Sequence, residues 1–172
     1  MMGLIVCPLA DLPMVVETRH PSRVLTLLDP ELEMAPPKGL PAEAWLRLSL
    51  HDIHAPTPGM IAPTHQDIER LLAFAEAWDD EAPMVVHCHA GISRSTAAAY
   101  AIACARSPRV AEETIAHRLR EASPQAYPNR RIVALADQVL GRGGAMVAGV
   151  EAMGGNNFVS DSIPFDFAVR HG

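Results

Sequence analysis

The chain is poor in positive charge and has a single lysine, Lys38, among its 14 basic residues. Its 20 acidic residues give a formal net charge of −6. A nucleic-acid-binding protein normally presents clustered Lys and Arg to the phosphate backbone, so this balance argues against a nucleic-acid partner. The positive charge that the chain does have is carried almost entirely by arginine and histidine.

Cysteine is also scarce, and long apolar runs are missing. The three cysteines are an odd number without paired spacing, which is typical of a reducing compartment rather than of a disulfide framework. The N-terminal stretch has no basic region and is interrupted by Asp11 and Pro13, so it is a poor signal peptide. No apolar run reaches membrane-spanning length. These absences predict a cytoplasmic protein without a membrane partner.

The length and composition predict one domain with a sizeable core. The chain has 172 residues, of which 49% are hydrophobic. We expect this domain to cover residues 1–155. Residues 156–172 have no hydrophobic period and are predicted to form an extended C-terminal tail. The oligomeric state cannot be read from the sequence.

Strand and helix patterns alternate along the chain. Short apolar or alternating runs bounded by Pro, Gly or Asp predict strands at 3–9, 23–29, 45–50 and 82–87. Residues 10–22 could hold a short helix, and amphipathic or Ala-rich runs predict helices at 65–78, 93–106, 110–122 and 129–140. Thr64 is the expected N-cap of the first of these helices, and Gly141 the expected stop of the last. The alternation predicts an α/β fold with a central, mostly parallel sheet of about four to five strands flanked by helices.

A short loop joins the strand at 82–87 to the helix at 93–106, within the sequence HCHAGISRS. Backbone N–H groups in such a turn form an anion-binding concavity, with the positive end of the helix dipole behind it. Gly91 supplies the backbone freedom that the turn requires. Arg94 can hold two oxygens of a bound phosphate with its planar guanidinium. The residues expected to bind phosphate are His89, Ala90, Gly91, Ile92, Ser93 and Arg94.

Cys88 lies at the floor of this concavity. The helix dipole and Arg94 both favour the thiolate form of its side chain. A thiolate below a bound phosphate is arranged for in-line attack on phosphorus. Ser95 can donate to the sulfur when it must leave again, and His87 is expected to support the loop from behind through backbone hydrogen bonds.

The sequence HCHAGISRS resembles the signature His-Cys-x5-Arg-Ser/Thr of the protein tyrosine phosphatase superfamily. Its second half is similar to the AGxSRS form of the dual-specificity and compact bacterial enzymes. The runs RVLTLLD and WLRLSLHDI resemble the two strands that precede the general-acid loop in this family. The late run SPQAYPNRRIVALADQVL resembles a further family segment, in which Pro124, Pro128 and Asn129 match while Ser123 and Leu135 depart from the usual Arg and Gln.

This resemblance implies a cysteine-dependent phosphomonoester hydrolase that acts through a cysteinyl-phosphate intermediate and needs no metal or organic cofactor. The favoured substrate is phosphotyrosine, in a phosphorylated protein or a small phosphomonoester. The loop side chains include no lysine, which disfavours polyanionic phosphoinositides. In this family the general acid is an Asp some thirty-odd residues before the cysteine. Asp52 lies 36 residues before Cys88, follows a predicted strand and opens a Pro/Gly loop, so it is the candidate acid and base.

Other interpretations stay open. A dual-specificity phosphatase and a non-catalytic phosphate-binding module would both use the same loop. Rhodanese-type sulfurtransferases also place a cysteine in an anion-binding loop, but their loops lack the Arg-Ser ending. Cys88 could be a buried structural cysteine, as expected for Cys7 and Cys104. The histidines at 51, 54, 65 and 89 suggest a metal site, although their spacing does not match usual zinc motifs.

Overall fold

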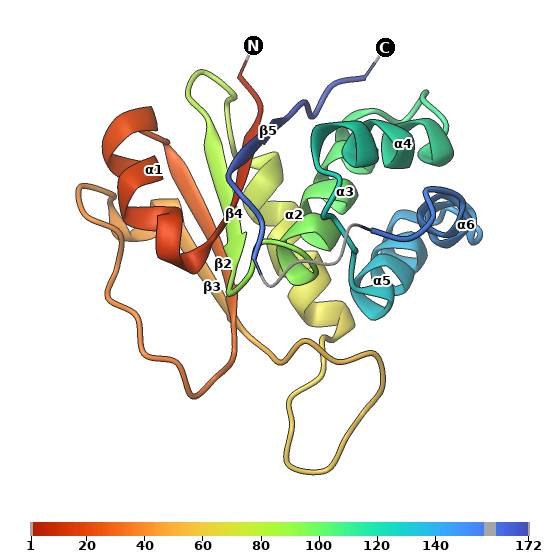
Figure 1. The fold of residues 1–172 in the computed structure, drawn as a ribbon, viewed down its shortest axis with the longest axis horizontal. Coiled ribbons are helices and arrows are strands. Elements are labelled where there is room, and N and C mark those ends of the chain that lie inside the picture. The colour runs from red at the N-terminus through yellow and green to blue at the C-terminus, as the bar shows by residue number, and fades with distance from the viewer. Residues whose placement is uncertain (1, 157–160, 172) are drawn as a thin grey trace.

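The computed structural model describes residues 2–156 and 161–171 of the chain. A five-stranded sheet in the order β3-β2-β4-β1-β5 forms its centre (Figure 1). The strands are β1 (Leu4–Pro8), β2 (Arg23–Leu28), β3 (Trp45–Ser49), β4 (Met84–Cys88) and β5 (Phe165–Phe167). The first four run parallel to one another, and β5 pairs antiparallel with β1. The predicted α/β fold with a mostly parallel sheet is confirmed.

The helices cover the two faces of the sheet unequally. On one face, α1 packs Leu12 and Val15 against Ile5, Cys7 and Val85. On the other face, a larger core joins the sheet to the remaining α-helices, which lie together to one side of it in Figure 1. The helical elements are η1 (Leu9–Asp11), α1 (Leu12–Arg19), η2 (Ala42–Ala44), α2 (His65–Glu76), α3 (Arg94–Arg106), α4 (Glu112–Ala122), α5 (Arg130–Leu140) and α6 (Ala145–Ala152).

Helix α3 begins at the Cys88 loop (residues 88–94) and runs through the centre of the larger core. Its residues 97–104 are fully buried. Most of them are alanine, because only small side chains let a helix pack closely against the sheet and several helices at once. This packing holds the start of α3, and with it Arg94 and Ser95, in a fixed position.

The predicted helix ends are confirmed where a specific residue caps them. The Thr64 side chain accepts a hydrogen bond from Asp67 N–H, and the Asp67 carboxylate accepts one from Thr64 N–H, so the two form a capping box at the start of α2. Gly141 ends α5 with a φ of 65°, in the left-handed region that favours glycine.

The parallel strands bring several predicted site residues to one edge of the sheet. Parallel strands end at the same edge, so Asp29 after β2, Asp52 after β3 and Cys88 at the end of β4 all lie there. In Figure 1 this edge is at the bottom. In the register of the sheet, Pro8 lies beside Cys88.

Two elements differ from the sequence-based expectation. Three helices were expected after the Cys88 loop, and the structure has four, because Ala145–Ala152 forms α6. Strand β5 falls within the expected tail at 156–172, of which residues 157–160 and 172 lie outside the described part of the chain. Within the described residues, none of the helices is long and apolar enough to span a membrane.

Candidate active site

The Cys88 side chain lies at the end of β4 with only 2% of the residue exposed. Gly91 N–H donates a hydrogen bond to Cys88 Sγ over 3.3 Å. Ser95 Oγ lies 3.1 Å from the same sulfur. A backbone N–H and a hydroxyl at these distances stabilise negative charge on sulfur, so the surroundings suit a thiolate.

Most carbonyl groups of the Cys88 loop accept hydrogen bonds from donors outside the loop. Five consecutive carbonyls, at residues 89–93, accept from Leu9 N–H, Ser162 N–H, Ser162 Oγ, Tyr127 N–H and Asn129 N–H in turn. In a trans peptide unit the C=O and the following N–H point in opposite directions. Holding the carbonyls outward therefore turns the loop N–H groups inward, as an anion site requires.

Gly91 is required in this loop by conformation and by space. Its φ is +71°, which L side chains rarely adopt. A Cβ atom at this position would lie 2.8 Å from Pro8 N and 2.9 Å from Ser162 Oγ. Any larger residue would push the loop away from β1 or from the C-terminal segment.

Arg94 is 5% exposed and is held along one edge of its guanidinium. Its Nη1 donates to Asp29 Oδ1 over 2.7 Å and to Leu50 O over 2.8 Å. Its buried Nε has no hydrogen-bond partner among the described residues. Nε and Nη2 form the edge that binds two oxygens of a phosphate in parallel, so one edge is anchored and the other is available. Asp29 was not identified from the sequence, because its role depends on β2 lying next to β4.

Asp52 reaches the Cys88 loop from the Asp52 loop (residues 51–63). Its Oδ1 accepts from Ser93 Oγ over 2.7 Å and from Asn129 Nδ2 over 2.8 Å. Asn129 also caps α5, because its Oδ1 accepts from Ile132 N–H over 2.9 Å. Asn129 therefore connects Asp52 to the start of α5. Its resemblance to a family motif was visible in the sequence, but its contact with Asp52 was not.

His51 closes the neck of the Asp52 loop and is not available as a metal ligand. Its backbone N–H donates to Ile61 O over 2.8 Å, and its Nδ1 accepts from Ile61 N–H over 2.8 Å. Its Nε2 faces the Glu31 carboxylate at 3.0 Å. Across residues 2–156 and 161–171, no three His, Cys, Asp or Glu side chains are grouped to hold a metal ion.

His87 lies behind Cys88 as a buried, neutral side chain. Trp45 Nε1 can only donate, and it does so to Thr26 Oγ1 over 2.9 Å. The Thr26 hydroxyl can then donate its own proton to His87 Nε2, which lies 2.7 Å away. The other ring nitrogen, His87 Nδ1, lies 3.3 Å from Cys88 O. Burial lowers the pKa of His87 to about 4, so the ring is neutral at pH 7. A ring held at both nitrogens supports the strand end that carries Cys88.

The other two cysteines differ from Cys88 in their surroundings. Cys7 and Cys104 are fully buried, and burial raises the pKa of each thiol to about 12. Cys7 packs in the core on the α1 side of the sheet, whereas Cys88 packs on the opposite side. Their sulfur atoms therefore lie on opposite faces of the sheet, which argues against a disulfide between them.

We expect brief iodoacetamide treatment at neutral pH to label Cys88 well before Cys7 and Cys104, because alkylation requires the thiolate. Inorganic phosphate at saturating concentration should slow the labelling of Cys88 alone. Peptide mass spectrometry of the labelled protein measures this order. Labelling of Cys7 or Cys104 ahead of Cys88 would contradict the thiolate environment described above.

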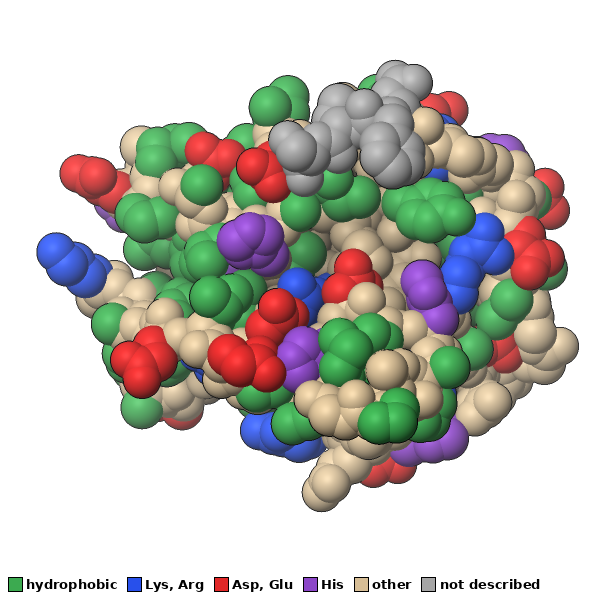
Figure 2. All heavy atoms as spheres, turned by 60° about the horizontal axis from the view of Figure 1, so that its bottom comes forward, with side chains coloured by type: hydrophobic (Ala, Val, Ile, Leu, Met, Phe, Trp, Pro, Cys, Tyr) green, Lys and Arg blue, Asp and Glu red, His purple; other side chains and the backbone are tan. Residues whose placement is uncertain are grey.

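An apolar groove of about 700 Å³ lies beside the Cys88 loop. It runs between α1 and the Pro-rich segment before β3, and its walls include Leu9, Leu12, Pro13, Val16, Met34 and Pro36. Leu9 N–H donates to His89 O over 3.0 Å, so the groove adjoins the loop directly. In Figure 2 the molecule is turned so that the bottom of Figure 1 comes forward. Acidic and histidine side chains gather near the middle of this face.

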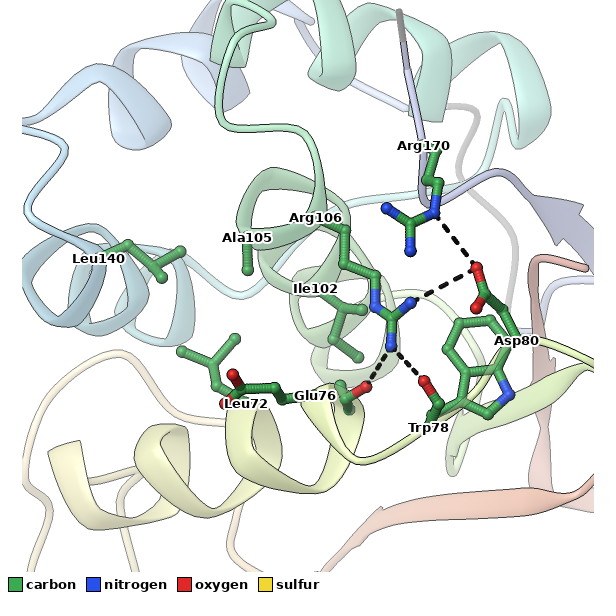
Figure 3. Close-up of a pocket in the computed structure, with 10 residues that line it drawn as sticks. Leu72, Glu76, Trp78, Asp80, Ile102, Ala105, Arg106, Leu140 and Arg170 are labelled. Atoms are coloured by element: carbon green, nitrogen blue, oxygen red, sulfur yellow. Dashed lines mark hydrogen bonds and ion pairs between the residues drawn. The ribbon is translucent and has the colours of Figure 1, made fainter. Parts of the chain in front are cut away.

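A second pocket, of about 490 Å³, lies at the far end of α3 (Figure 3). Arg106 projects into it but is fully engaged, since its Nη2 donates to Ala75 O over 2.7 Å and to Trp78 O over 2.6 Å. Its Nη1 lies 3.5 Å from Asp80 Oδ2, which also pairs with Arg170. Helix α3 is 13 residues long, or about 20 Å, so this pocket is remote from Cys88. The Arg106 contacts fix the end of α3.

Comparison with known proteins relates this site to phosphatases. Residues 23–106, which include the Cys88 loop, match the model of a family described as "Tc-R-P: Polymorphic toxin system, DSP-PTPase phosphatase". No curated protein sequence matches the chain.

Several solved structures share the fold. The PTP-2 phosphatase of Cydia pomonella has a TM-score of 0.61 and 21% identity, with 79% of this chain and 84% of that chain covered. Human DUSP28 has a TM-score of 0.63 and 18% identity, with 84% and 96% covered. PTPMT1 in complex with PI(5)P has a TM-score of 0.56 and 15% identity, with 87% and 93% covered. At these identities, the likeness establishes the common fold.

Proposed function

We propose that the chain is a cysteine-dependent phosphatase that hydrolyses phosphotyrosine through a cysteinyl-phosphate intermediate on Cys88, because its residues 23–106 match the model of a DSP-PTPase phosphatase family. One observation carries this proposal: a cysteine sulfur with hydrogen-bond donors and an arginine with a free guanidinium edge lie in the same loop. Gly91 N–H donates to the Cys88 sulfur, Ser95 Oγ lies 3.1 Å from that sulfur, and Arg94 of the same loop has a buried Nε without a partner among the described residues.

The first chemical step transfers the phosphoryl group to sulfur. The Cys88 thiolate attacks phosphorus while the bond from phosphorus to the tyrosine oxygen breaks. The loop N–H groups and the free edge of Arg94 bind the three other phosphate oxygens, where negative charge is concentrated. Asp52, protonated at this stage, gives its proton to the departing phenolic oxygen. Its Oδ1 already accepts two hydrogen bonds, so Oδ2 is the oxygen that carries the proton.

The second step returns the enzyme to its starting state. A water molecule attacks phosphorus and gives a proton to the Asp52 carboxylate, while the bond between phosphorus and sulfur breaks. The sulfur leaves as a thiolate, and the Ser95 hydroxyl 3.1 Å away stabilises it by donating a hydrogen bond. The products are inorganic phosphate and the regenerated Cys88 thiolate, with Asp52 again protonated. No metal or organic cofactor takes part in this scheme.

The charges around the site favour a substrate with a single phosphate. The loop side chains at 89, 90, 92 and 93 include no lysine. The carboxylates of Asp29, Glu31 and Asp52 lie at or near the site, where Asp29 pairs with Arg94 and Glu31 with His51. Several carboxylates at the mouth repel a polyphosphate more strongly than a monophosphate. The adjoining apolar groove suits an apolar side chain of a phosphorylated protein.

We also propose a cytoplasmic location for the protein. Cys7, Cys88 and Cys104 are all free thiols, and the proposed chemistry needs Cys88 reduced. A reducing compartment keeps that thiol available.

A hydrolysis panel tests the proposed function. We expect phosphotyrosine peptides to be hydrolysed with a higher kcat/KM than phosphoserine peptides, and both to exceed PI(5)P and phosphoinositides with several phosphates. The control is the Cys88→Ser protein, which should be inactive on every substrate. Equal rates on phosphotyrosine and phosphoserine would indicate dual specificity instead. No turnover of any substrate, with phosphate still bound, would indicate a non-catalytic phosphate-binding module.

A further inference from the structure

Ser162 of the C-terminal segment (residues 161–171) makes hydrogen bonds to the Cys88 loop. Ser162 N–H donates to Ala90 O over 3.0 Å. Ser162 Oγ lies within hydrogen-bond distance of two carbonyl oxygens, Gly91 O at 3.1 Å and Ile163 O at 3.2 Å, and the shorter contact is the one to Gly91. Ser162 is 5% exposed, so both hydrogen bonds are shielded from water. This residue supplies the donors for two of the five loop carbonyls.

These two hydrogen bonds set the direction of particular N–H groups. The Ala90 carbonyl and the Gly91 N–H belong to one peptide unit and point in opposite directions. With the carbonyl held by Ser162, the Gly91 N–H points to the other side of the loop and donates to Cys88 Sγ over 3.3 Å. In the same way, the hydrogen bond from Ser162 Oγ to Gly91 O fixes the next peptide unit and turns Ile92 N–H toward the anion site.

The C-terminal segment is itself fixed to the framework that carries the loop. Strand β5 pairs with β1, which is the neighbour of β4 in the sheet. Phe167 and Val169 are 3% and 2% exposed and pack in the larger core. Ser107, which follows α3, accepts from His171 N–H over 2.8 Å and donates to Val169 O over 3.0 Å. The segment is therefore attached at β1 and at the end of α3, and Ser162 has a defined place.

We propose that Ser162 is a positioning residue for phosphate binding, and that residues 161–171 form part of the catalytic unit. This inference rests on the proposed function of the Cys88 loop. It revises the expectation that the phosphatase domain ends at residue 155 and is followed by a tail. Ser162 does not touch the substrate; it acts through the Gly91 and Ile92 N–H groups.

The test compares Ser162→Ala with Ser162→Thr and with Ile163→Ala. The alanine variant removes only the Oγ–H donor and leaves the Gly91 carbonyl buried without this partner. We expect inorganic phosphate, added as the probe, to bind about tenfold more weakly, which corresponds to ~1.4 kcal/mol. The pH midpoint of Cys88 alkylation should rise, because the N–H groups that stabilise the thiolate are less well aligned. Ser162→Thr keeps a hydroxyl and should restore both values.

Ile163→Ala is the matched control, because its side chain is 73% exposed and it is the next residue of the same segment. It should match the wild type in phosphate affinity, alkylation and melting temperature. The proposal is overturned if Ser162→Ala keeps the wild-type phosphate affinity and alkylation profile, or if Ile163→Ala changes them equally. Phosphate binding and alkylation need no turnover, so these outcomes are separate from a failure of the proposed phosphatase function.

Discussion

Replacement of Cys88 by serine is expected to lower kcat on a phosphotyrosine peptide by at least ~10³-fold, because the serine hydroxyl is not ionised at neutral pH and attacks phosphorus poorly. Binding of inorganic phosphate should change little, since the loop N–H groups and Arg94 remain in place. Steady-state kinetics together with calorimetric titration of phosphate separate the two effects. Loss of turnover with retained binding identifies Cys88 as the nucleophile.

A matched cysteine change controls for folding. Cys104→Ala also changes a buried cysteine, but Cys104 lies in the core near the C-terminal end of α3, away from the Cys88 loop. We expect this variant to lower the melting temperature, because it leaves a small cavity, and to keep most of its activity. Activity of Cys88→Ser within about tenfold of the wild type would exclude the covalent mechanism, whatever the stability of the variant.

Asp52→Asn is expected to lower the rate on phosphotyrosine by ~10²–10⁴-fold, the usual contribution of a positioned general acid. The phenolic oxygen of tyrosine has a pKa near ~10 and needs a proton to leave. An acidic phenol can leave as the anion, so the loss should shrink as the pKa of the leaving group falls. The rate of the wild type should fall at high pH, because the general acid loses its proton there. This fall should be absent from the pH profile of Asp52→Asn. Kinetics on a series of aryl phosphates measure these three effects.

Asp67→Asn is a suitable control for Asp52→Asn. Asp67 is the next carboxylate after Asp52 in the sequence, and it caps α2 through its contacts with Thr64. Its replacement is expected to destabilise the fold by at most ~1 kcal/mol without a dependence on the leaving group. An equal loss for every leaving group in Asp52→Asn would assign Asp52 a role in folding or binding instead. A rate equal to that of the wild type would leave the acid unassigned.

The parts of the fold and site that the sequence predicts are those encoded by local patterns. Short runs rich in Val, Ile and Leu located β1, β2 and β4, an alternating run located β3, and the expected N-cap Thr64 located the start of α2. The Cys88 loop was predictable because its cysteine, glycine and arginine lie within seven residues, so their relative positions depend on one turn. The position of Asp52 near the Cys88 loop was predictable because Asp52 lies three residues after β3 and near the start of a loop.

The parts that could not be predicted depend on contacts between distant segments. Strand β5 has three residues, too few to show an alternating pattern, and it forms only because the edge of β1 is available to it. Helix α6 lies between glycine-rich stretches that read as turns. Asp29 meets Arg94, and Ser162 meets Gly91, only once the order of the strands is known. Asp29 and Ser162 could therefore not be predicted from the sequence, whereas the Cys88 loop and His87 behind it could.

The most direct test of the covalent mechanism is to trap the intermediate. The Asp52→Asn protein, mixed with an aryl phosphate that has an acidic leaving group, should complete the first step but hydrolyse the phosphoenzyme slowly, because the general base of the second step is missing. Rapid quenching in denaturant followed by peptide mass spectrometry should then find phosphate on Cys88, with one equivalent of phenol released in a burst. Release of phenol without a burst and without phosphate on Cys88, or phosphate on a different residue, would contradict the mechanism.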